Sequence, residues 1–313
     1  MKSTGVVLAC GLATLDVVQT VEAVPTANQK VVADGLLVTV GGPAANAAVT
    51  CAALGAPSRL LSRIGGGPLA SAMHADLAAH GVGVLDAAAP GSAPPVSTVL
   101  VTRGTGERAV ISVNASLVPD GSADLPDPTW DEVVVVLVDG HHLDLAMACA
   151  ARARRLGIPV LLDGGSWKPG LADLLALVDV AVLSADFAVP GGDDALAEVR
   201  ALGPALVARS RGAAPIEVLG PGPGAARASV PVPTVDVVDT LGAGDVLHGA
   251  LVAWAASQAG RVPGADDVAQ WLRGLAWAAE VASASCAAPG ARGWVADTAR
   301  VAGWRADLGC GGP

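Results

Sequence analysis

Two carboxylates stand at the ends of a glycine-rich turn in the segment 239–245, whose sequence is DTLGAGD. The apolar, helix-like stretch VLHGALVAWAA follows it directly. A glycine turn that opens a helix leaves unpaired backbone N–H groups at the positive end of the helix, a site for an anion such as a transferring phosphoryl group. Gly242, Ala243 and Gly244 would supply these groups. Asp245 is then placed to act as a base that takes the proton of a hydroxyl while its oxygen attacks phosphorus.

The same residues also have a purely structural interpretation. Asp245 would be a favourable acid in the first turn of a helix, and the GAG sequence a tight turn. The chain has neither a GxxxxGK[ST] motif nor a strand–GxGxxG–helix unit near its N-terminus, so it lacks the usual P-loop and dinucleotide-binding signatures. The turn alone therefore leaves both interpretations open.

Composition limits the classes of protein that can carry this turn. Apolar residues make up 52% of the 313 residues and charged residues 15%, which indicates a globular chain and excludes a disordered one. The net charge of −10 argues against a nucleic-acid partner. Five widely spaced cysteines without a CxxC pair argue against a disulfide framework or a zinc site and favour a cytoplasmic location. No run of about 18 apolar residues occurs, so no membrane association is expected.

Beyond residue 130, short apolar runs alternate with stretches of helical spacing. Strands are expected at 133–140, 159–165, 180–184 and 205–209, and helices at 143–156, 171–177 and 193–201. Each helical stretch has the length of a crossover connection, so this pattern predicts a parallel, doubly wound sheet covered on both faces. A hairpin loop is expected at 219–226, followed by helices at 245–259 and 266–285. No repeat or low-complexity linker divides the chain, and we expect a single domain over residues 1–313.

The first 115 residues contain a second kind of β structure. A buried strand is expected at 5–11, a helix from the glycine turn at 41 to Gly55, a strand at 57–64 and a helix at 68–80. Shorter, partly alternating segments occur at 29–40, and at 96–102 and 109–113 around the turn RGTGE, which predicts hairpins. These segments are expected to form a small sheet outside the main one.

Two regions together resemble the signature regions of the ribokinase-like (PfkB) carbohydrate kinases. They are GGPAANAAVTCAALGA at 41–56 and VVDTLGAGD at 237–245, and the likeness extends over nearly the whole chain. The phrases GLATLDV, VVDTLGAGD and VLSADFA are most similar to ketohexokinases and their bacterial relatives. The resemblance implies an α/β fold with a doubly wound, mainly parallel sheet flanked by helices. It also implies a small β-sheet lid, from about 14–40 and 95–115, that closes over a sugar.

The resemblance assigns roles to the residues of the central turn and of the sugar site. Asp245 resembles the catalytic base of the family, and Gly242, Ala243 and Gly244 resemble its anion hole. Four further residues match positions on the acceptor side of the family's site: Asp16, Gly42, Asn46 and Arg108. The first three match residues that contact the sugar. Arg108 resembles an arginine that reaches over the sugar or the phosphates. The implied function is a sugar kinase that uses ATP and Mg²⁺, with room for a monovalent cation such as K⁺, and that phosphorylates a small sugar, with a ketose such as fructose favoured.

The nucleotide side is less fully marked. Gly212 occupies a position where, in the family, the nucleotide-binding loop follows a strand. Cys286 occupies a position near the helix on the adenine side. Lys168 is the only lysine of the sequence beyond Lys30. It is expected either to reach a phosphate or to be a solvated lysine at a helix start.

The chain departs from the family pattern at two informative places. Many members carry an Asn-x-x-Glu motif that orders magnesium and phosphate, but Ser184 and Phe187 occupy those positions here. Asp186 is a nearby carboxylate that would act on the metal through water. Pro43 stands where ketohexokinases have a sugar-binding asparagine, which weakens the expectation of fructose itself.

Three histidines lie close to these positions in the sequence. His141 and His142 follow the buried strand at 133–140, where open α/β sheets bind ligands. One of them contacts the substrate, or they form a polar strand end before a helix. Joint metal binding is not expected, because neighbours on a strand point to opposite faces. His248 shares a helix face with Asp245 and is expected mainly to pack in the core.

Three rival functions remain on the sequence alone. A nucleoside kinase would share the motifs but would require aromatic or broad apolar contacts, and aromatic residues make up only 3% of the chain. A phosphosugar kinase would need several cationic side chains around the acceptor. A non-catalytic sugar- or nucleotide-binding protein would have no need for a base at Asp245. A homodimer formed through the exposed edges of the lid is also expected.

Overall fold

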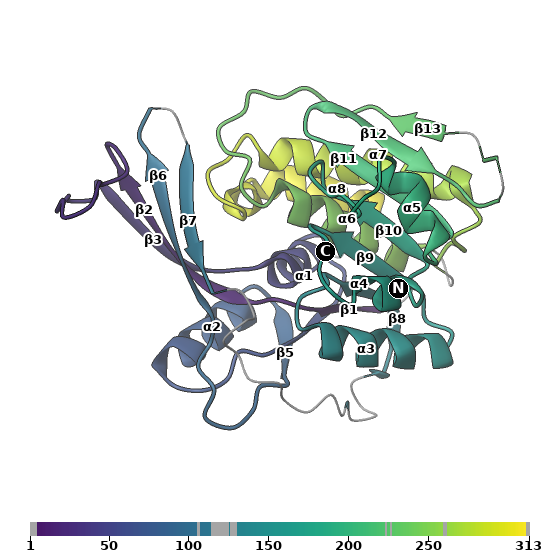
Figure 1. The fold of residues 1–313 in the computed structure, drawn as a ribbon, viewed down its shortest axis with the longest axis horizontal. Helices are drawn as coiled ribbons and strands as arrows, with labels where there is room; N and C mark the ends of the chain where they lie inside the picture. Colours follow the sequence, from purple (N-terminus) through teal and green to yellow (C-terminus); the bar gives the residue numbers. More distant parts are fainter. Residues whose placement is uncertain are drawn as a thin grey trace.

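The architecture is taken from a computed structural model of the chain. It describes residues 5–104, 107–113, 125, 130–222, 224–225, 227–258 and 262–310. Two sheets are present in this part of the chain, a large one of nine strands and a small one of four. The small sheet projects from the side of the main body, as Figure 1 shows.

The large sheet is mainly parallel, and its strands are joined by helical crossovers. Its order is β13-β12-β11-β10-β9-β8-β1-β4-β5, and only β12 and β13 run antiparallel to their neighbours. The strands are β1 (Val6–Cys10), β4 (Ser58–Ser62), β5 (Val82–Asp86), β8 (Val133–Val138), β9 (Val160–Gly164), β10 (Val180–Leu183), β11 (Leu206–Arg211), β12 (Ala214–Leu219) and β13 (Arg227–Val230). The expectation of a doubly wound, mainly parallel sheet is confirmed.

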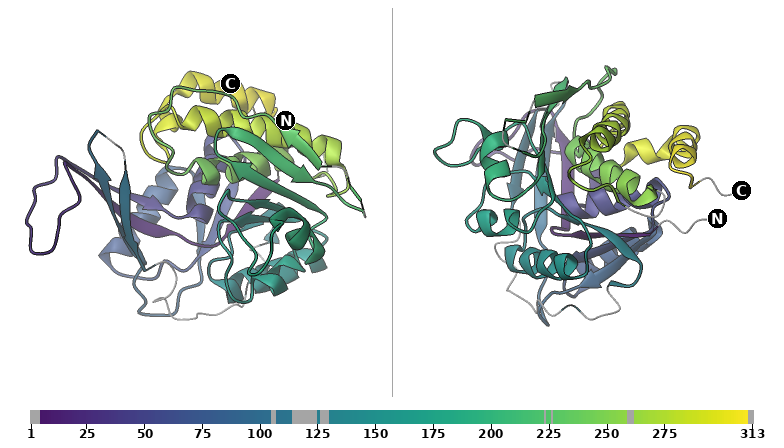
Figure 2. Two further views of the ribbon diagram at one scale, coloured as in Figure 1. Left: turned by 45° about the horizontal axis from the view of Figure 1, so that its top comes forward. Right: turned by 90° about the vertical axis from the view of Figure 1, so that its right-hand side faces the viewer.

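Helices cover both faces of this sheet because its strand side chains are apolar on both faces. Along β8, Val135 and Leu137 join one buried cluster, whereas Val136 and Val138 join the other. The two helical layers lie on opposite sides of the sheet in the right-hand view of Figure 2. The first cluster takes in α1 (Pro43–Ala53), α6 (Ala243–Ser257), α7 (Val268–Ser285) and α8 (Thr298–Asp307), and the second takes in α3 (Leu143–Arg155), α4 (Leu171–Leu175) and α5 (Ala195–Ala201).

The order of the strands reverses between β1 and β8. From β1 the chain proceeds outward through β4 and β5, and from β8 it proceeds outward in the opposite direction. Ligands of open α/β sheets bind beyond the carboxyl ends of the strands at such a switch point. The segments that follow Cys10 and Val138 are therefore the parts of the fold best placed to contact a substrate.

The small sheet combines the two early β regions. Its order is β3-β2-β6-β7, with β2 (Thr14–Val21), β3 (Gly35–Gly41), β6 (Val96–Thr102) and β7 (Arg108–Ser112). The two hairpins are antiparallel and are joined by the parallel pair β2 and β6. The expected small sheet is thus present. Residues 105, 106, 114 and 115 of its expected range lie outside the described residues.

Several boundaries and elements differ from the expectations. Asp16 lies inside β2, which begins at Thr14, before the first short β segment expected at 29–40. Strand β5 and helix α8 were not expected; β5 is only five residues long, and α8 contributes only two buried side chains, so neither has a strong pattern. Helix α2 (Pro68–Ala79) lies close to its expected range, and residue 259 of the expected helix at 245–259 lies outside the described part.

Candidate active site

The glycine turn of DTLGAGD opens helix α6 as expected. Gly242 occupies the N-cap of α6 with φ +74°, and a Cβ there would lie 2.4 Å from the Cβ of Ala291. Both the backbone conformation and the space therefore require glycine. The turn is fixed against the segment that follows α7, which holds the backbone amides of the first helical turn in one place.

Substitution of Gly242 with alanine tests this fixed turn. Gly242→Ala is expected to lower the free energy of unfolding by about 1–3 kcal/mol, since it adds left-handed strain and a clash with Ala291. The measurement is urea unfolding, with Gly244→Ala as the matched control because a Cβ at Gly244 has no atom within 4 Å. Equal destabilisation by the two substitutions would contradict the assignment.

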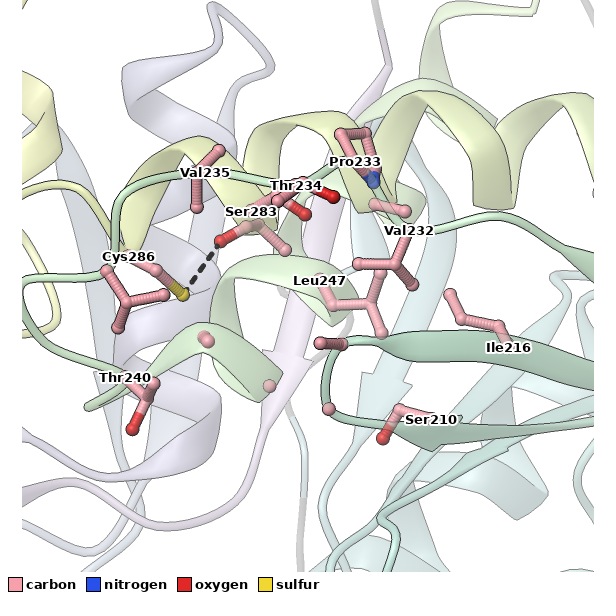
Figure 3. A pocket seen from close by; sticks show the side chains of 17 residues that line it. Ser210, Ile216, Val232, Pro233, Thr234, Val235, Thr240, Leu247, Ser283 and Cys286 are labelled. Carbon is pink, nitrogen blue, oxygen red and sulfur yellow. Dashed lines mark hydrogen bonds between the residues drawn. The ribbon is translucent and has the colours of Figure 1, made fainter.

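A pocket of about 390 Å³ adjoins the N-terminus of α6, as Figure 3 shows. It lies between the β11–β12 hairpin, the segment 232–240 and the helices α6 and α7, and most of its wall is apolar. Such volume and lining are typical of a small-molecule site. Gly212, Cys286, Ala243 and Gly244, which were assigned to nucleotide binding and the anion hole, all line it.

Asp245 lies next to this pocket, and the pKa of its carboxyl group is raised. Its Oδ2 accepts a hydrogen bond of 2.7 Å from Nδ2 of Asn46, which lies on α1. Burial, together with the negative charge of Asp163, raises the pKa of Asp245 to about 7, while the Asn46 hydrogen bond and His248 act in the opposite direction. A carboxylate with a pKa near neutrality is suited to accept and release protons.

Arg292 holds the other end of the Asn46 amide. Its Nε donates to Oδ1 of Asn46 at 3.1 Å, and its Nη1 contacts Oδ2 of Asp76 at 2.7 Å. Because Oδ1 of Asn46 accepts from the guanidinium, its Nδ2 must face Asp245, so the orientation of the amide is determined. Sequence reasoning missed Arg292, and no local signal marks it, since its two partners are 246 and 216 residues away in the chain.

Asp16 and Gly42 lie where the small sheet joins the main one. Burial raises the pKa of Asp16 to about 6, against the lowering effects of a hydrogen bond with Ser97 and of the charge of Arg292. Gly42 has φ +97°, and a Cβ there would lie 2.4 Å from the carbonyl oxygen of Leu12. The electrostatic contact of Arg292 with both Asp16 and Asp245 indicates that these carboxylates share one polar region.

Asp139, which sequence reasoning did not select, organises the switch point. Its carboxylate accepts from the backbone N–H groups of Leu12 at 2.8 Å, Ala44 at 3.2 Å and His141 at 2.8 Å. It thereby joins the end of β8 to the segment after β1 and to the start of α1. A signal was present in the sequence, since a buried strand that ends in an aspartate at the switch point is a position where polar groups converge.

Arg108 and Asp239 connect the small sheet to the turn. Arg108, at the start of β7, forms an ion pair with Oδ1 of Asp239, the first carboxylate of DTLGAGD. Asp239 also accepts from the backbone N–H groups of Leu241 and Gly290, each at 2.9 Å. Asp239 therefore acts as a structural acid at the entry of the turn, and Arg108 lies at the site through this contact.

Lys168 is placed apart from the pocket that Gly212 and Cys286 line. Its ammonium group lies near Gly140, and its charge acts on His141 and Asp163 at the ends of β8 and β9. Burial, the largest effect, lowers the pKa of His141, as does the charge of Lys168. Lys168 thus faces the edge of the sheet that carries Asp139 and Asp163, on the side of the reacting groups.

His142 lies at the N-cap of α3 in a left-handed conformation, with φ 48°. Its side chain caps no backbone group of that helix. The residue is buried, and burial lowers the pKa of its ring to about 4, which keeps the imidazole neutral. His142 thus lies at the end of the strand next to the switch point, where open α/β sheets bind ligands.

The segment that replaces the Asn-x-x-Glu motif has a structural role at two of its positions. Ser184 Oγ donates to the carbonyl oxygen of Gly165 at 2.8 Å, and Phe187 is fully buried with its ring 6.2 Å from that of Trp167. Asp186 is exposed. Among the described residues, no three His, Cys, Asp or Glu side chains gather in a way that could hold a metal ion, and no helix could cross a membrane.

Comparison with known proteins gives consistent matches over nearly the full chain. The model of the pfkB family of carbohydrate kinases matches residues 6–294. The fold is similar to that of a ribokinase from Thermotoga maritima, with a TM-score of 0.76, 20% identity, and coverage of 96% of this chain and 99% of that one. It is also similar to an Arabidopsis thaliana ribokinase complexed with ribose and ATP (TM-score 0.73, 21% identity, 96% and 98% coverage). A Xylella fastidiosa fructokinase with bound ATP has a TM-score of 0.72 and 19% identity, with coverage of 97% of this chain and 99% of that one.

Proposed function

Because the chain belongs to the pfkB family of carbohydrate kinases, we propose that it transfers the γ-phosphoryl group of ATP to a hydroxyl of a small sugar, with a ketose such as fructose favoured. The observation that carries this proposal is the position of Asp245. A carboxyl group with a pKa of about 7 immediately follows a turn whose residues Ala243 and Gly244 line the pocket. Base and anion hole are thereby adjacent on one helical turn.

In the proposed reaction, the acceptor hydroxyl lies against the Asp245 oxygen that Asn46 does not hold. Asp245 takes the proton of this hydroxyl as the sugar oxygen attacks the γ-phosphorus, and the bond between that phosphorus and the bridging oxygen of ATP breaks. The backbone amides at Gly242 and Gly244 donate to the phosphoryl oxygens at the positive end of α6. The amide of Ala243 donates to the carbonyl oxygen of Thr240 at 3.3 Å, so it must leave this contact to join them. ADP then leaves with the electron pair of the broken bond.

The apolar pocket is the proposed site of the adenosine part of ATP. Gly212 closes its edge at the β11–β12 hairpin, and Cys286 lies at the end of α7. The bound ATP in the fructokinase and ribokinase structures of similar fold supports ATP as the nucleotide. Lys168, at the ends of β8 and β9, is proposed to reach the phosphates rather than the adenosine.

Magnesium fits this site only as a companion of ATP. The described residues offer no cluster of ligands, and Mg²⁺ is commonly held by substrate phosphates, waters and one or two carboxylates. The exposed Asp186 would contact its hydration shell. When bound, the ion neutralises charge that develops on the phosphates. A K⁺ ion remains a general expectation of the resemblance.

The sugar is proposed to lie between the small sheet and the main one, with the small sheet as a lid. Asp16 and Gly42 would contact its hydroxyl groups from the junction of the two sheets. Asn46 already bonds Arg292 and Asp245, but it retains one N–H and one lone pair for a sugar hydroxyl. Arg108 is proposed to exchange part of its contact with Asp239 for the sugar or the phosphates.

A panel of acceptors tests the proposal. Purified protein is supplied with Mg²⁺ and ATP, and ADP release is measured with sugars, nucleosides and sugar phosphates. Turnover with an unmodified sugar is expected. Preference for a nucleoside or a sugar phosphate would overturn the acceptor class, whereas thermal stabilisation by a sugar or nucleotide without turnover would indicate a non-catalytic binding protein.

We also propose that two copies of the chain form a homodimer in the cytoplasm through their small sheets. The outer strands of each small sheet expose apolar side chains that include Leu36 and Val38 on β3 and Ile111 on β7. An open sheet edge with apolar side chains is a ready surface for a second copy. We expect light scattering to give twice the 30.6 kDa mass of one chain, and Ile111→Lys to reduce it toward one chain. A single-chain mass for the unaltered protein would contradict the dimer.

A further inference from the structure

His248 is buried three residues after the proposed base, and both of its ring nitrogens face oxygen atoms. Nδ1 lies 2.7 Å from the carbonyl oxygen of Gly244, in the first turn of α6. Nε2 lies 3.0 Å from the carbonyl oxygen of Val182, in strand β10. The ring therefore joins the start of the helix that carries the anion hole to the sheet beneath it.

Both contacts are hydrogen bonds only if each ring nitrogen donates. A carbonyl oxygen can only accept a hydrogen bond, so each ring nitrogen must donate. Both nitrogens carry hydrogen only in the imidazolium form. A buried cation requires a counter-ion, and Oδ2 of Asp163, at the end of β9, lies 3.3 Å from Nδ1 of His248. The exposed fractions of the two side chains are 6% and 9%, so the pair is shielded from water.

The two members of the pair have opposite effects on the pKa of Asp245. Asp163 raises the pKa of Asp245, and His248 lowers it. The other groups that face Asp245 are Asn46, Asp139 and Arg292. Burial raises the pKa of the Asp163 carboxyl overall, and the charge of His248 is the largest effect in the opposite direction. Asp163 also faces Asp139, His141 and Lys168.

We propose that the His248–Asp163 ion pair is a positioning device for the base: it holds the first turn of α6 on the sheet and presents two opposite charges to Asp245. This inference rests on the proposed kinase activity. His248 reaches the pocket only through the backbone carbonyl of Gly244, and neither His248 nor Asp163 lines the pocket, so they are positioning residues rather than catalytic ones. The expected core-packing role of His248 is thus incomplete, because its ring is buried but fully engaged in polar contacts.

Opposite shifts of the pH profile test the proposal. In His248→Gln, loss of the positive charge beside Asp163 is expected to move the acidic limb of kcat/KM to higher pH by about one unit. In Asp163→Asn, loss of the negative charge is expected to move it to lower pH. The double variant should lie between the two. If both single variants lose activity while their limbs stay at the pH of the unaltered protein, the pair has only a structural role and the inference is overturned.

Two further measurements do not depend on turnover. The ¹⁵N–¹H spectrum of the His248 ring, assigned by its loss in His248→Gln, should show two protonated nitrogens at pH 7–8, and a single protonated nitrogen would overturn the ion pair. The carboxyl ¹³C signal of Asp245, assigned with Asp245→Asn, should titrate at higher pH in His248→Gln and at lower pH in Asp163→Asn. If no acceptor is phosphorylated, the proposed function fails, but these spectra still decide the inference.

His74→Gln is the matched control for the histidine substitution. His74 lies on α2 with 38% of its side chain exposed, and it forms a pair of 3.4 Å with Asp86. The same change of side chain is thus made in another histidine–aspartate pair away from Asp245. We expect the acidic limb and the Asp245 signal to be unchanged. An equal shift in His74→Gln would mean that the effect is general, and it would also overturn the inference.

Discussion

Replacement of Asp245 with asparagine is expected to reduce kcat by about 10²–10⁴-fold, the usual contribution of a positioned general base. Asparagine keeps the size of the side chain and its acceptor for Nδ2 of Asn46. The change therefore removes the proton acceptor with little change of packing. The measurement is steady-state ADP release with the best acceptor, and a kcat within about tenfold of the unaltered protein would show that Asp245 is not the base.

The pH dependence of the unaltered protein follows from the same carboxyl group. Only ionised Asp245 can accept a proton, and its pKa is raised to about 7. We therefore expect kcat/KM to fall about tenfold for each unit that the pH drops below about 7. A profile that is flat down to pH 5 would contradict this assignment.

Stability provides the control for the asparagine variant. The pKa of Asp245 is about 7 in the folded protein and about 3.9 in the unfolded chain. As the pH rises, this acid therefore ionises at a lower pH in the unfolded chain than in the folded protein. The folded state then binds more protons between these values, so its stability falls as the pH rises through this window. Asparagine removes this cost. Asp245→Asn should consequently unfold at the same or a higher temperature than the unaltered protein at pH 8, and a marked loss of stability would mean that its inactivity reflects misfolding.

The parts of the fold that sequence reasoning predicted are those with strong local patterns. The strand at β8 is an uninterrupted run of apolar residues, and the turn before α6 has glycines at both positions next to Ala243. Such features depend on neighbours in the chain, so their positions can be inferred without a tertiary structure. Strand β5 and helix α8 have no comparable pattern, because their packing depends on distant elements.

The site divides in the same way. Asp245 and Asn46 belong to two sequence signatures, and the fold brings them into a hydrogen bond across 199 residues of sequence. Arg292 has no signature, and its importance appears only when α1, α2 and the segment after α7 are seen together. His248 is intermediate: its helical spacing from Asp245 is visible in the sequence, but its partners Asp163 and Val182 are on separate strands.

Arg292 carries the second prediction with a large expected effect. Arg292→Met removes the donor that orients Asn46 and takes from Asp76 its guanidinium partner, leaving His80 at 3.8 Å. We expect the free energy of unfolding to fall by about 1.5–3 kcal/mol, the range for hydrogen bonds to charged groups. We also expect kcat to fall by about 10–100-fold, because the freed Asn46 amide can rotate and misplace Asp245. Urea unfolding and ADP release measure the two effects.

A second substitution separates these two effects. In the double variant Arg292→Met with Asp76→Asn, the charge of Asp76 is removed as well, so most of the lost stability should return. The orientation of Asn46 does not return, since no donor faces its Oδ1, and kcat should stay low. Recovery of kcat together with stability would show that Arg292 supports the fold alone. Arg292→Lys should also leave kcat low, because one ammonium group cannot reproduce the fork of the guanidinium that contacts Asn46 and Asp76 at once.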